Sequence, residues 1–207
     1  MRQITLSRFG FIGLFILITS YNTSAQTSAA PPTTRSAMLK ANESKLSYPL
    51  FKGSTNMGVM PVTDVTAPYT NQKTKLVFDM GHPSKDAEKG MTNEGVEEIM
   101  RIINLHMAAG VTPENLDAYI VFYGPAANAF LTDEMYQKRF QIANPNLKWV
   151  DQLQQKGVKI IVCGQTTALR QLEMSAFPKG ITKAFSAITA LTDLQNRGHV
   201  LFKISEN

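Results

Sequence analysis

The sequence predicts a three-layer α/β/α fold around a mostly parallel sheet of about five strands. Short segments rich in β-branched and aromatic residues alternate with longer amphipathic segments, which is typical of strands joined by crossover helices. Residues 157–163 are almost continuously apolar, as expected of a strand in a sheet that has helices on both faces. These two observations place the chain in the α/β class.

The folded domain is expected over residues 73–207. Strands are predicted by β-rich runs and their flanking turn residues, and they are expected over residues 75–79, 116–123, 157–163, 181–185 and 199–204. Helices are predicted by apolar residues at helical spacing, and they are expected over residues 93–109, 126–142, 145–157, 166–176 and 186–198, with Asn144 as the cap of the third. Ligands bind beyond the carboxyl ends of parallel strands, so the turns after Asp79, Tyr123 and Cys163 form the candidate site.

Residues 1–25 have the features of a secretory signal peptide. Arg2 and Arg8 precede the apolar run 9–18, and the small residues 23–25 follow it. The run is shorter than the roughly 20 apolar residues that cross a bilayer. We therefore expect cleavage after Ala25 and an exported protein, periplasmic or secreted, with no stable membrane insertion after cleavage. An uncleaved membrane anchor is the alternative.

Residues 26–72 are expected to form a linker followed by an extended arm. This segment is rich in Thr, Ser, Pro, Asn and Gly, and it lacks a sustained period. Its repeated prolines argue against a helix. Two apolar pieces, 48–53 and 57–62, are expected to pack against the domain.

Composition excludes several classes of function. Removal of residues 1–25 takes away two arginines and no acidic residue, which lowers the net charge from +5 to +3, and no basic stripe interleaved with aromatic residues occurs, so no nucleic acid partner is expected. One cysteine and three histidines argue against a disulfide framework and a metal centre. Dinucleotide, Walker A, nucleophile-elbow and H-E-x-x-H motifs are absent, so no cofactor is predicted.

Cys163 is the strongest candidate for a reactive residue. It ends the most apolar strand, and Gly164, Gln165 and Thr166 then open a helix. Free amides at a helix N-terminus attract negative charge and lower the pKa of a thiol placed there. Gly164 is expected to leave the turn uncrowded, so that a substrate can approach the sulfur. The alternative is a buried structural cysteine, because free cysteine often packs as a small apolar side chain.

Three further residues have weaker claims to the site, and a fourth, His199, has none. His82 follows the first strand and is a candidate base or anion-binding group, or else a solvated loop residue. Tyr123 closes the second strand and either lines a pocket or packs, and Asn128 is either a ligand contact or a helix cap. His199, after Gly198, is expected at the surface.

The sequence resembles the DsrE/DsrF-like (YchN-like) family. The resemblance lies in the order of elements, in the third strand 157–163 with its turn Cys163-Gly164-Gln165, in the stretch 121–125 and in the segments 186–187 and 194–198. The resemblance covers about residues 74–204. It implies a compact subunit that forms trimers or hexamers. In sulfur-relay members, the cysteine that matches Cys163 holds sulfur as a persulfide and passes it to a thiol-bearing partner protein. This chain departs from that pattern in its predicted export and in Tyr123, where the family often has histidine.

Two functions are therefore expected from the sequence. The first is a sulfur carrier, similar to a sulfurtransferase, in which Cys163 is the persulfide-forming nucleophile, the amides of residues 164–167 stabilise anionic sulfur and His82 assists. The second is a non-catalytic oligomeric binding or assembly module with a structural cysteine. A redox-sensing thiol is a third option, weakened by the lack of a second cysteine to resolve the oxidised form.

Overall fold

Five parallel strands form one sheet in the order β4-β3-β2-β1-β5. In the computed structural model, which describes residues 34–65, 72–83 and 87–204, the strands are β1 (Thr74–Met80), β2 (Leu116–Phe122), β3 (Lys159–Cys163), β4 (Thr182–Ala184) and β5 (Val200–Ile204). All five lie where the sequence predicts them. The predicted signal peptide falls outside the described residues.

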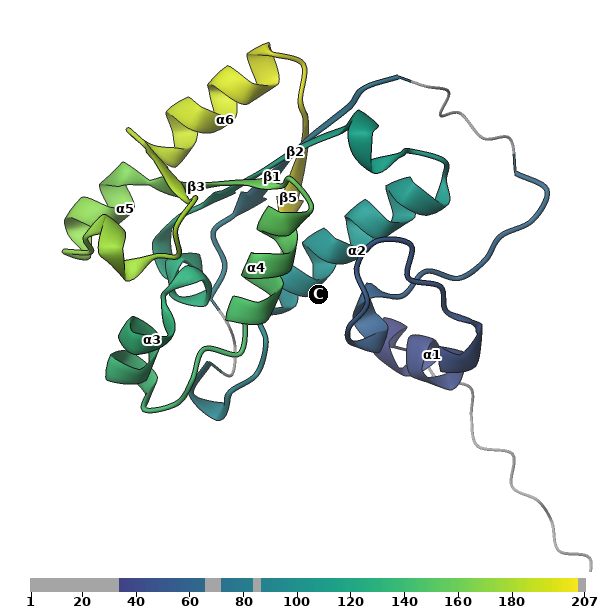
Figure 1. Cartoon of the computed structure of the whole chain (residues 1–207), viewed down its shortest axis with the longest axis horizontal. Coiled ribbons are helices and arrows are strands. Elements are labelled where there is room, and N and C mark those ends of the chain that lie inside the picture. The colour runs from purple at the N-terminus through teal and green to yellow at the C-terminus, as the bar shows by residue number, and fades with distance from the viewer. Residues whose placement is uncertain (1–33, 66–71, 84–86, 205–207) are drawn as a thin grey trace, which may run out of the picture. The chain divides into compact units, whose positions relative to one another are not determined.

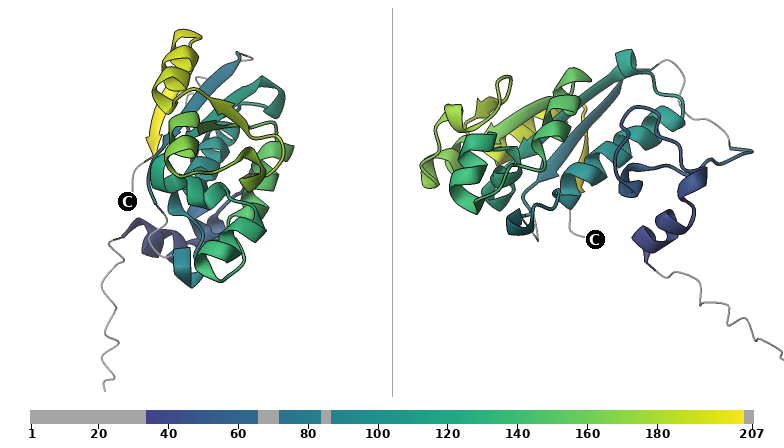
Figure 2. Two further views of the ribbon diagram at one scale, coloured as in Figure 1. Left: turned by 90° about the vertical axis from the view of Figure 1, so that its left-hand side faces the viewer. Right: turned by 60° about the horizontal axis from the view of Figure 1, so that its bottom comes forward.

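Helices cover both faces of this sheet, which confirms the three-layer prediction. On one face lie α2 (Glu94–Ala108) and α4 (Leu147–Gln155), and α6 (Ala187–Asn196) lies on the other (Figure 1). Figure 2 shows the same layers from two further directions. The larger apolar core lies on the α2 and α4 side, whereas a smaller cluster lies under α6. The remaining short elements are α3 (Asp133–Phe140), α5 (Gly164–Leu169), η3 (Ala87–Lys89), η4 (Pro113–Asn115), η5 (Gly124–Phe130) and η6 (Met174–Ala176).

The carboxyl ends of the central strands are level with one another. Phe122 of β2 is in register with both Met80 of β1 and Val162 of β3, and Cys163 is in register with Ala184 of β4. The residues that follow β1, β2 and β3 therefore meet at one edge of the sheet, as the parallel topology predicts.

The prediction of one continuous helix over 126–142 is wrong, because two shorter helices occupy this segment. The chain forms the 3-10 helix η5, becomes extended at Leu131 and starts again as α3, where the hydroxyl of Thr132 accepts a hydrogen bond from the amide of Met135. Asn144 is not the cap of α4, because its side-chain amide donates to the carbonyls of Ala129 and Leu131. The helix predicted over 166–176 is also shorter, because α5 ends at Leu169 and the chain then turns.

The N-terminal arm contains helical turns that were not expected from its proline-rich sequence. These are α1 (Arg35–Ala41), η1 (Glu43–Lys45) and η2 (Thr55–Met57). Thr34 caps α1, since its hydroxyl accepts a hydrogen bond from the amide of Ala37. The prolines of this segment lie outside α1, so they do not disrupt it.

A buried asparagine fastens the arm to α2. Asn104 accepts hydrogen bonds from the amides of Leu50 and Phe51 at 3.0 and 2.9 Å, and it donates to the carbonyls of Phe51 and Met57 at 2.8 and 2.9 Å. The arm therefore packs on its own chain through polar contacts in an otherwise apolar layer.

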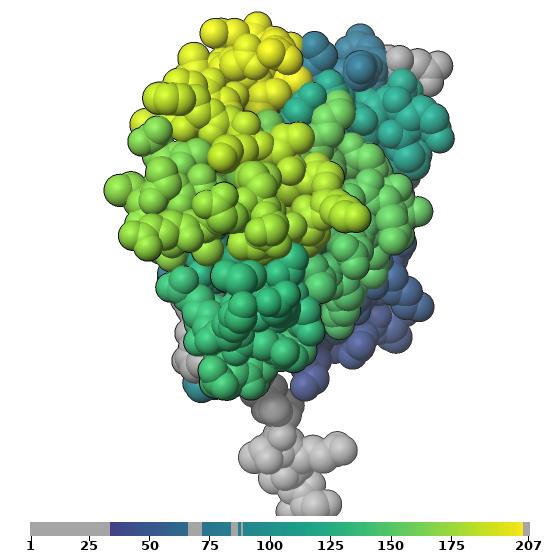
Figure 3. All heavy atoms as spheres, turned by 60° about the vertical axis from the view of Figure 1, so that its left-hand side comes forward, coloured from purple at the N-terminus to yellow at the C-terminus, as the bar shows by residue number. Residues whose placement is uncertain are grey.

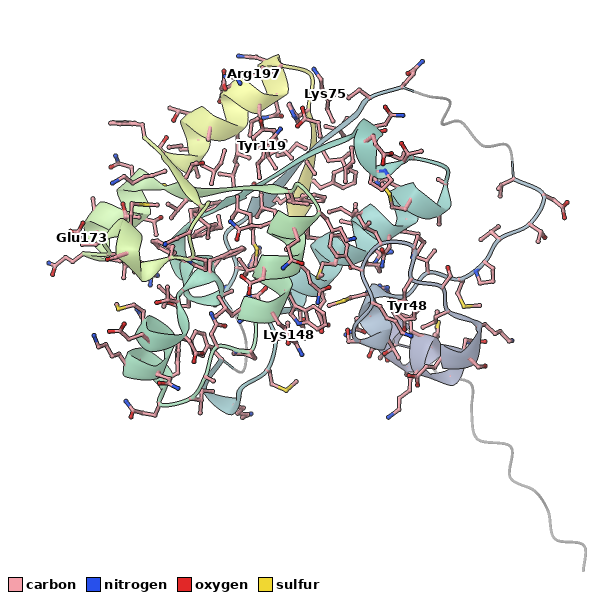
Figure 4. The ribbon with its side chains drawn as sticks, in the orientation of Figure 1. Tyr48, Lys75, Tyr119, Lys148, Glu173 and Arg197 are labelled. Carbon is pink, nitrogen blue, oxygen red and sulfur yellow. The ribbon has the colours of Figure 1, made fainter. Side chains whose placement is uncertain are left out.

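The amino-terminal edge of the sheet carries a charged cluster. Asp117 lies 2.7 Å from Lys159 and 3.4 Å from the Nε2 atom of His199. His199 was predicted at the surface, but it is only 6% exposed, because the end of α6 and the ring of Tyr119 cover it. Figure 4 labels Tyr119 at this side of the sheet.

Candidate functional site

Cys163 lies at the meeting point of β3, α5 and α6. It is the last residue of β3 and the N-cap of α5, and it is 5% exposed. Its side chain belongs to the small apolar cluster under α6, together with Val77, Val121, Ala187 and Leu194. The alternation of side chains along a strand places Val77, Val121 and Cys163 on one face of the sheet, where Ala187 and Leu194 of α6 pack against them.

Three backbone amides and one hydroxyl donate hydrogen bonds to the sulfur of Cys163. The amide and the hydroxyl of Thr166 and the amide of Gln165 come from the first turn of α5, and the amide of Ala187 comes from the first residue of α6. Burial raises the pKa of Cys163, but these hydrogen bonds outweigh the burial and hold the pKa below the usual value of a thiol. The arrangement therefore stabilises the thiolate.

Thr166 links the thiol to the end of β2. The hydroxyl that donates to Cys163 also accepts a hydrogen bond from the amide of Gly124 at 2.9 Å. Thr166 is buried, so this hydroxyl has little access to water. The neighbouring Thr167 makes a different contact, because its hydroxyl donates to the carbonyl of Gly164 at 2.9 Å. Only the first of these two threonines acts on the sulfur.

Gly164 allows a close approach between α5 and the end of β4. A Cβ atom at this position would lie 2.6 Å from the carbonyl oxygen of Ala184 and 2.9 Å from that of Phe185. The space beside Gly164 is thus filled by backbone, and the expectation that this turn is left open for a substrate is wrong. Gln165 is exposed, and its side-chain amide donates to the Phe185 carbonyl at 3.4 Å.

A cavity of about 580 Å³ lies beside this turn, between α5 and β4. Gly164, Gln165, Lys183 and Phe185 are among its lining residues, whereas Cys163 is not. Glu173 lies at its outer end and is labelled in Figure 4. The cavity therefore adjoins the cysteine turn without opening onto the sulfur.

Tyr123 is packed beside the thiol. It lies one residue beyond β2 and packs against the apolar cluster that contains Cys163. Burial raises the pKa of Tyr123, and the interaction with Asp79 and the negative charge of Cys163 raise it further. The sequence placed Tyr123 at this edge but gave no sign of its contact with Asp79.

The other two predicted residues lie further from the centre of this network. His82 is half-buried in the turn after β1, and none of the contacts found for Cys163 among the described residues involves it. Asn128 lies inside η5 rather than at a helix start, so it is not a helix cap. Its Oδ1 atom is buried without a hydrogen-bond partner in the part of the chain that the structure describes.

Within residues 34–65, 72–83 and 87–204, no three His, Cys, Asp or Glu side chains gather in a way that could hold a metal ion. Among the same described residues, no helix has the length and apolar character needed to cross a membrane.

Sequence reasoning missed two residues of the site, Ala187 and Asp79. The amide of Ala187 reaches the sulfur from a second helix, and only the tertiary fold brings α6 to the end of β3. The sequence predicts Asp79 at the end of a strand, but its effect on the pKa of Tyr123 depends on where the fold places the tyrosine ring. A capping serine, Ser186, marks the start of α6 in the sequence and was the one available signal for the second helix terminus.

The DsrE/DsrF-like family matches residues 60–204 of the chain. This protein is a member of that family. Membership confirms the resemblance seen in the sequence and places this DsrE/DsrF-like protein in a family that is associated with sulfur relay. Its single cysteine, Cys163, is free and buried at the strand end described above.

Two solved structures are similar to this DsrE/DsrF-like protein. MTH1491, a protein of unknown function from Methanobacterium thermoautotrophicum, is 17% identical with a TM-score of 0.47. The ychN protein from E. coli is 16% identical with a TM-score of 0.44. Each comparison covers 63% of this chain and 98% of the other chain. No curated protein matches the chain.

Proposed function

We propose that this DsrE/DsrF-like protein is a sulfur carrier that holds sulfane sulfur as a persulfide on Cys163. The observation that carries the proposal is the set of four hydrogen bonds from the first turns of α5 and α6 to the sulfur. Such donors stabilise a thiolate, and the thiolate is the nucleophilic form of cysteine. The association of the family with sulfur relay supports the same chemistry.

In the proposed loading step, the Cys163 thiolate attacks the outer sulfur of a donor persulfide, R–S–SH. A sulfur–sulfur bond forms to Cys163, the bond within the donor breaks, and the donor leaves as the thiolate R–S⁻. The thiolate of an acceptor protein then attacks the outer sulfur of the Cys163 persulfide and regenerates the Cys163 thiolate. Sulfur moves without a net change of oxidation state, so no oxidant or reductant is required.

Six residues around Cys163 have a role in the proposed sulfur transfer. Gln165, Thr166 and Ala187 stabilise the negative charge on sulfur through their hydrogen bonds. Gly164 permits the close packing that brings α5 to this place. His82, in the turn at the same sheet edge, is the proposed donor of a proton to the leaving thiolate. Asn128, in η5 after the end of β2, is proposed to contact the sulfur donor.

Sulfur loading tests this proposal directly. After incubation with a persulfide donor, the wild-type chain should gain the mass of one sulfur atom, and Cys163→Ala should gain none. Removal of one small buried side chain should lower the free energy of unfolding by only about 1 kcal/mol, so the variant should stay folded. Equal loading of the wild type and the variant would contradict the proposal.

The alternative is an assembly module in which Cys163 only packs. Three large apolar side chains near the cysteine turn favour a role in assembly, because Leu169, Phe185 and Ile188 are 85%, 80% and 77% exposed. Figure 3 shows the face that the segment from α5 to α6 forms, coloured lime to yellow. An exposed apolar surface of this kind marks an interaction site.

We also propose that a second copy of the chain covers this surface in a homo-oligomer, as the family resemblance implies. Sedimentation should then show a trimer or a hexamer, and Phe185→Asp should shift the protein toward the monomer. A monomeric wild type would overturn this proposal and leave the sulfur-loading test unaffected. Export of the mature chain is likewise proposed from residues 1–25, and it is tested by the compartment in which the full chain accumulates.

A further inference from the structure

The cavity of about 580 Å³ between α5 and β4 has no role in the sulfur transfer proposed above. Its volume is in the range of cavities that bind small molecules. Gly164, which follows Cys163 in the chain, and Ala184, the partner of Cys163 in the sheet, both line it, but the sulfur itself does not. The cavity is therefore a separate candidate binding site.

Two side chains of opposite charge line this cavity. Lys183 belongs to β4, and Glu173 precedes η6 and is labelled in Figure 4. Both are exposed, and among the described residues neither side chain makes an ion pair or a hydrogen bond, with the other or with a third residue. Because the two charges do not neutralise each other, a ligand that carries one charge of each sign can pair with both at once.

Part of the lining is apolar. Leu172 packs against the main core and also lines the cavity. Ala168 adds a small apolar side chain, and the ring of Phe185 lines the same cavity while it is 80% exposed. Covering such a ring with an apolar group is favourable. A ligand that matches this lining therefore combines its two charges with an apolar part.

The end of α5 shapes one wall of the cavity. Gln171 has a φ of 53°, in the left-handed region that glycine or asparagine usually occupies after a helix. The amide of Leu172 then donates to the carbonyl of Thr167 at 2.9 Å, and Leu172 and Glu173 continue along the cavity. The side-chain amide of Gln171 lines the cavity without a hydrogen-bond partner in the part of the chain that the structure describes. It is a further polar group that a ligand can contact.

We propose that this cavity binds a free amino acid with an apolar side chain. Lys183 pairs with the carboxylate of the ligand, and Glu173 pairs with its ammonium group. Leu172 and Phe185 contact its side chain, and the amide of Gln171 donates a hydrogen bond to its carboxylate. The inference goes beyond the proposed sulfur transfer, because it needs no reaction of the thiol.

Isothermal titration calorimetry of the full chain with three probes tests this proposal. L-Phenylalanine carries both charges, 3-phenylpropanoate lacks the ammonium group, and 2-phenylethylamine lacks the carboxylate. Exposed ion pairs are weak, so each missing charge should weaken binding by roughly threefold to fivefold. L-Phenylalanine should therefore bind most tightly. No detectable binding of L-phenylalanine, or equal affinity for all three probes, overturns the proposal.

Two variants test which side chain pairs with which charge. Lys183→Gln should weaken the binding of L-phenylalanine and 3-phenylpropanoate and leave that of 2-phenylethylamine unchanged. Glu173→Gln should weaken the binding of L-phenylalanine and 2-phenylethylamine and leave that of 3-phenylpropanoate unchanged. Both residues are exposed, so both variants should stay folded, which circular dichroism checks. A folded variant that weakens the binding of all three probes alike, or of none, overturns the proposal.

Lys179→Gln and Glu134→Gln are the matched controls, because both residues are exposed and neither is among those that line the cavity. Their affinity for L-phenylalanine should equal that of the wild type, and a loss as large as in the test variants would mean a general effect of charge and overturn the proposal. Cys163→Ala should also bind L-phenylalanine as the wild type does, so this inference and the sulfur-carrier function can fail separately. Phe185 stays unchanged in these variants, because it also belongs to the surface proposed for assembly.

Discussion

The backbone amide of Gly124 donates a hydrogen bond to Thr166 across 2.9 Å, and the hydroxyl that accepts it donates in turn to the sulfur of Cys163. One buried side chain therefore connects the end of β2, the first turn of α5 and the candidate nucleophile. The position of the sulfur depends on the packing of the sheet edge as well as on the helix that follows it.

Thr166→Val is predicted to destabilise the thiolate form of Cys163 and so to raise the pKa of this thiol. Valine has nearly the shape of threonine but leaves the Gly124 amide unpaired and removes one donor from the sulfur. A hydrogen bond to a charged group contributes about 1.5 kcal/mol, so alkylation of Cys163 at neutral pH should slow by roughly tenfold. The rate constant of iodoacetamide labelling measures this effect.

Thr167→Val provides the matched control for that experiment. Thr167 is the next residue in the chain and is also buried, but its hydroxyl donates to the carbonyl of Gly164 instead of the sulfur. The rate of Cys163 labelling in Thr167→Val should stay within about twofold of the wild-type rate, which is the range of indirect effects. Equal slowing in the two variants would show that Thr166 supports only the fold.

Asn104→Leu is predicted to release the N-terminal arm from α2. The change leaves the amides of Leu50 and Phe51 and the carbonyl of Met57 without the partner that Asn104 supplies. Unsatisfied buried groups of this kind cost on the order of 3 kcal/mol in the free energy of unfolding. Urea denaturation measures the loss, and limited proteolysis should cut the variant first within residues 46–58. A variant as stable as the wild type would show that the arm is held by its apolar contacts alone.

Asp117 is predicted to make the free energy of unfolding depend on pH in the acidic range. Burial raises the pKa of Asp117, but the hydrogen bond and charge of Lys159 and the charges of His199 and Lys73 outweigh it, so the pKa is lower in the folded protein than the ~3.9 of an unfolded chain. The ionised carboxylate therefore stabilises the fold above that value, and this contribution is lost as the pH falls through the folded pKa.

Asp117→Asn should accordingly lower the free energy of unfolding by about 1 kcal/mol at pH near 7, and the difference from wild type should shrink on acidification. Urea denaturation at a series of pH values measures this difference. Glu134→Gln is the control, because Glu134 is exposed and its one ion pair among the described residues is with Lys138. A difference that stays constant down to the acid limit would contradict the account of Asp117.

Most of the fold could be predicted from the sequence, because strand periodicity and helix spacing are local signals. All five strands were found, and the buried β3 was the clearest of them. The errors lie where one local signal outweighed another. Thr132 caps α3 within a segment whose apolar spacing predicts one continuous helix. Thr34 caps α1 in a segment whose prolines predict extended chain.

The candidate site was predictable only in part. Cys163 and its helix turn are contiguous in the sequence, so their relationship could be recognised there. The amide of Ala187 and the contact between Asp79 and Tyr123 join residues that are far apart in the chain. No periodicity encodes such pairs. His199 shows the same limit, since a histidine after a glycine gave no sign of the carboxylate and helix end that bury it.

The pH dependence of Cys163 alkylation in the folded wild-type protein, with residues 1–25 removed, decides whether this cysteine is a reactive thiolate. We expect reaction in the native state, with a midpoint clearly below the free-thiol value of ~8.5, because hydrogen bonds from two helix starts stabilise the thiolate. Failure to react until the protein unfolds would contradict it. Cys163 would then be a packing residue, and the protein would be an assembly module.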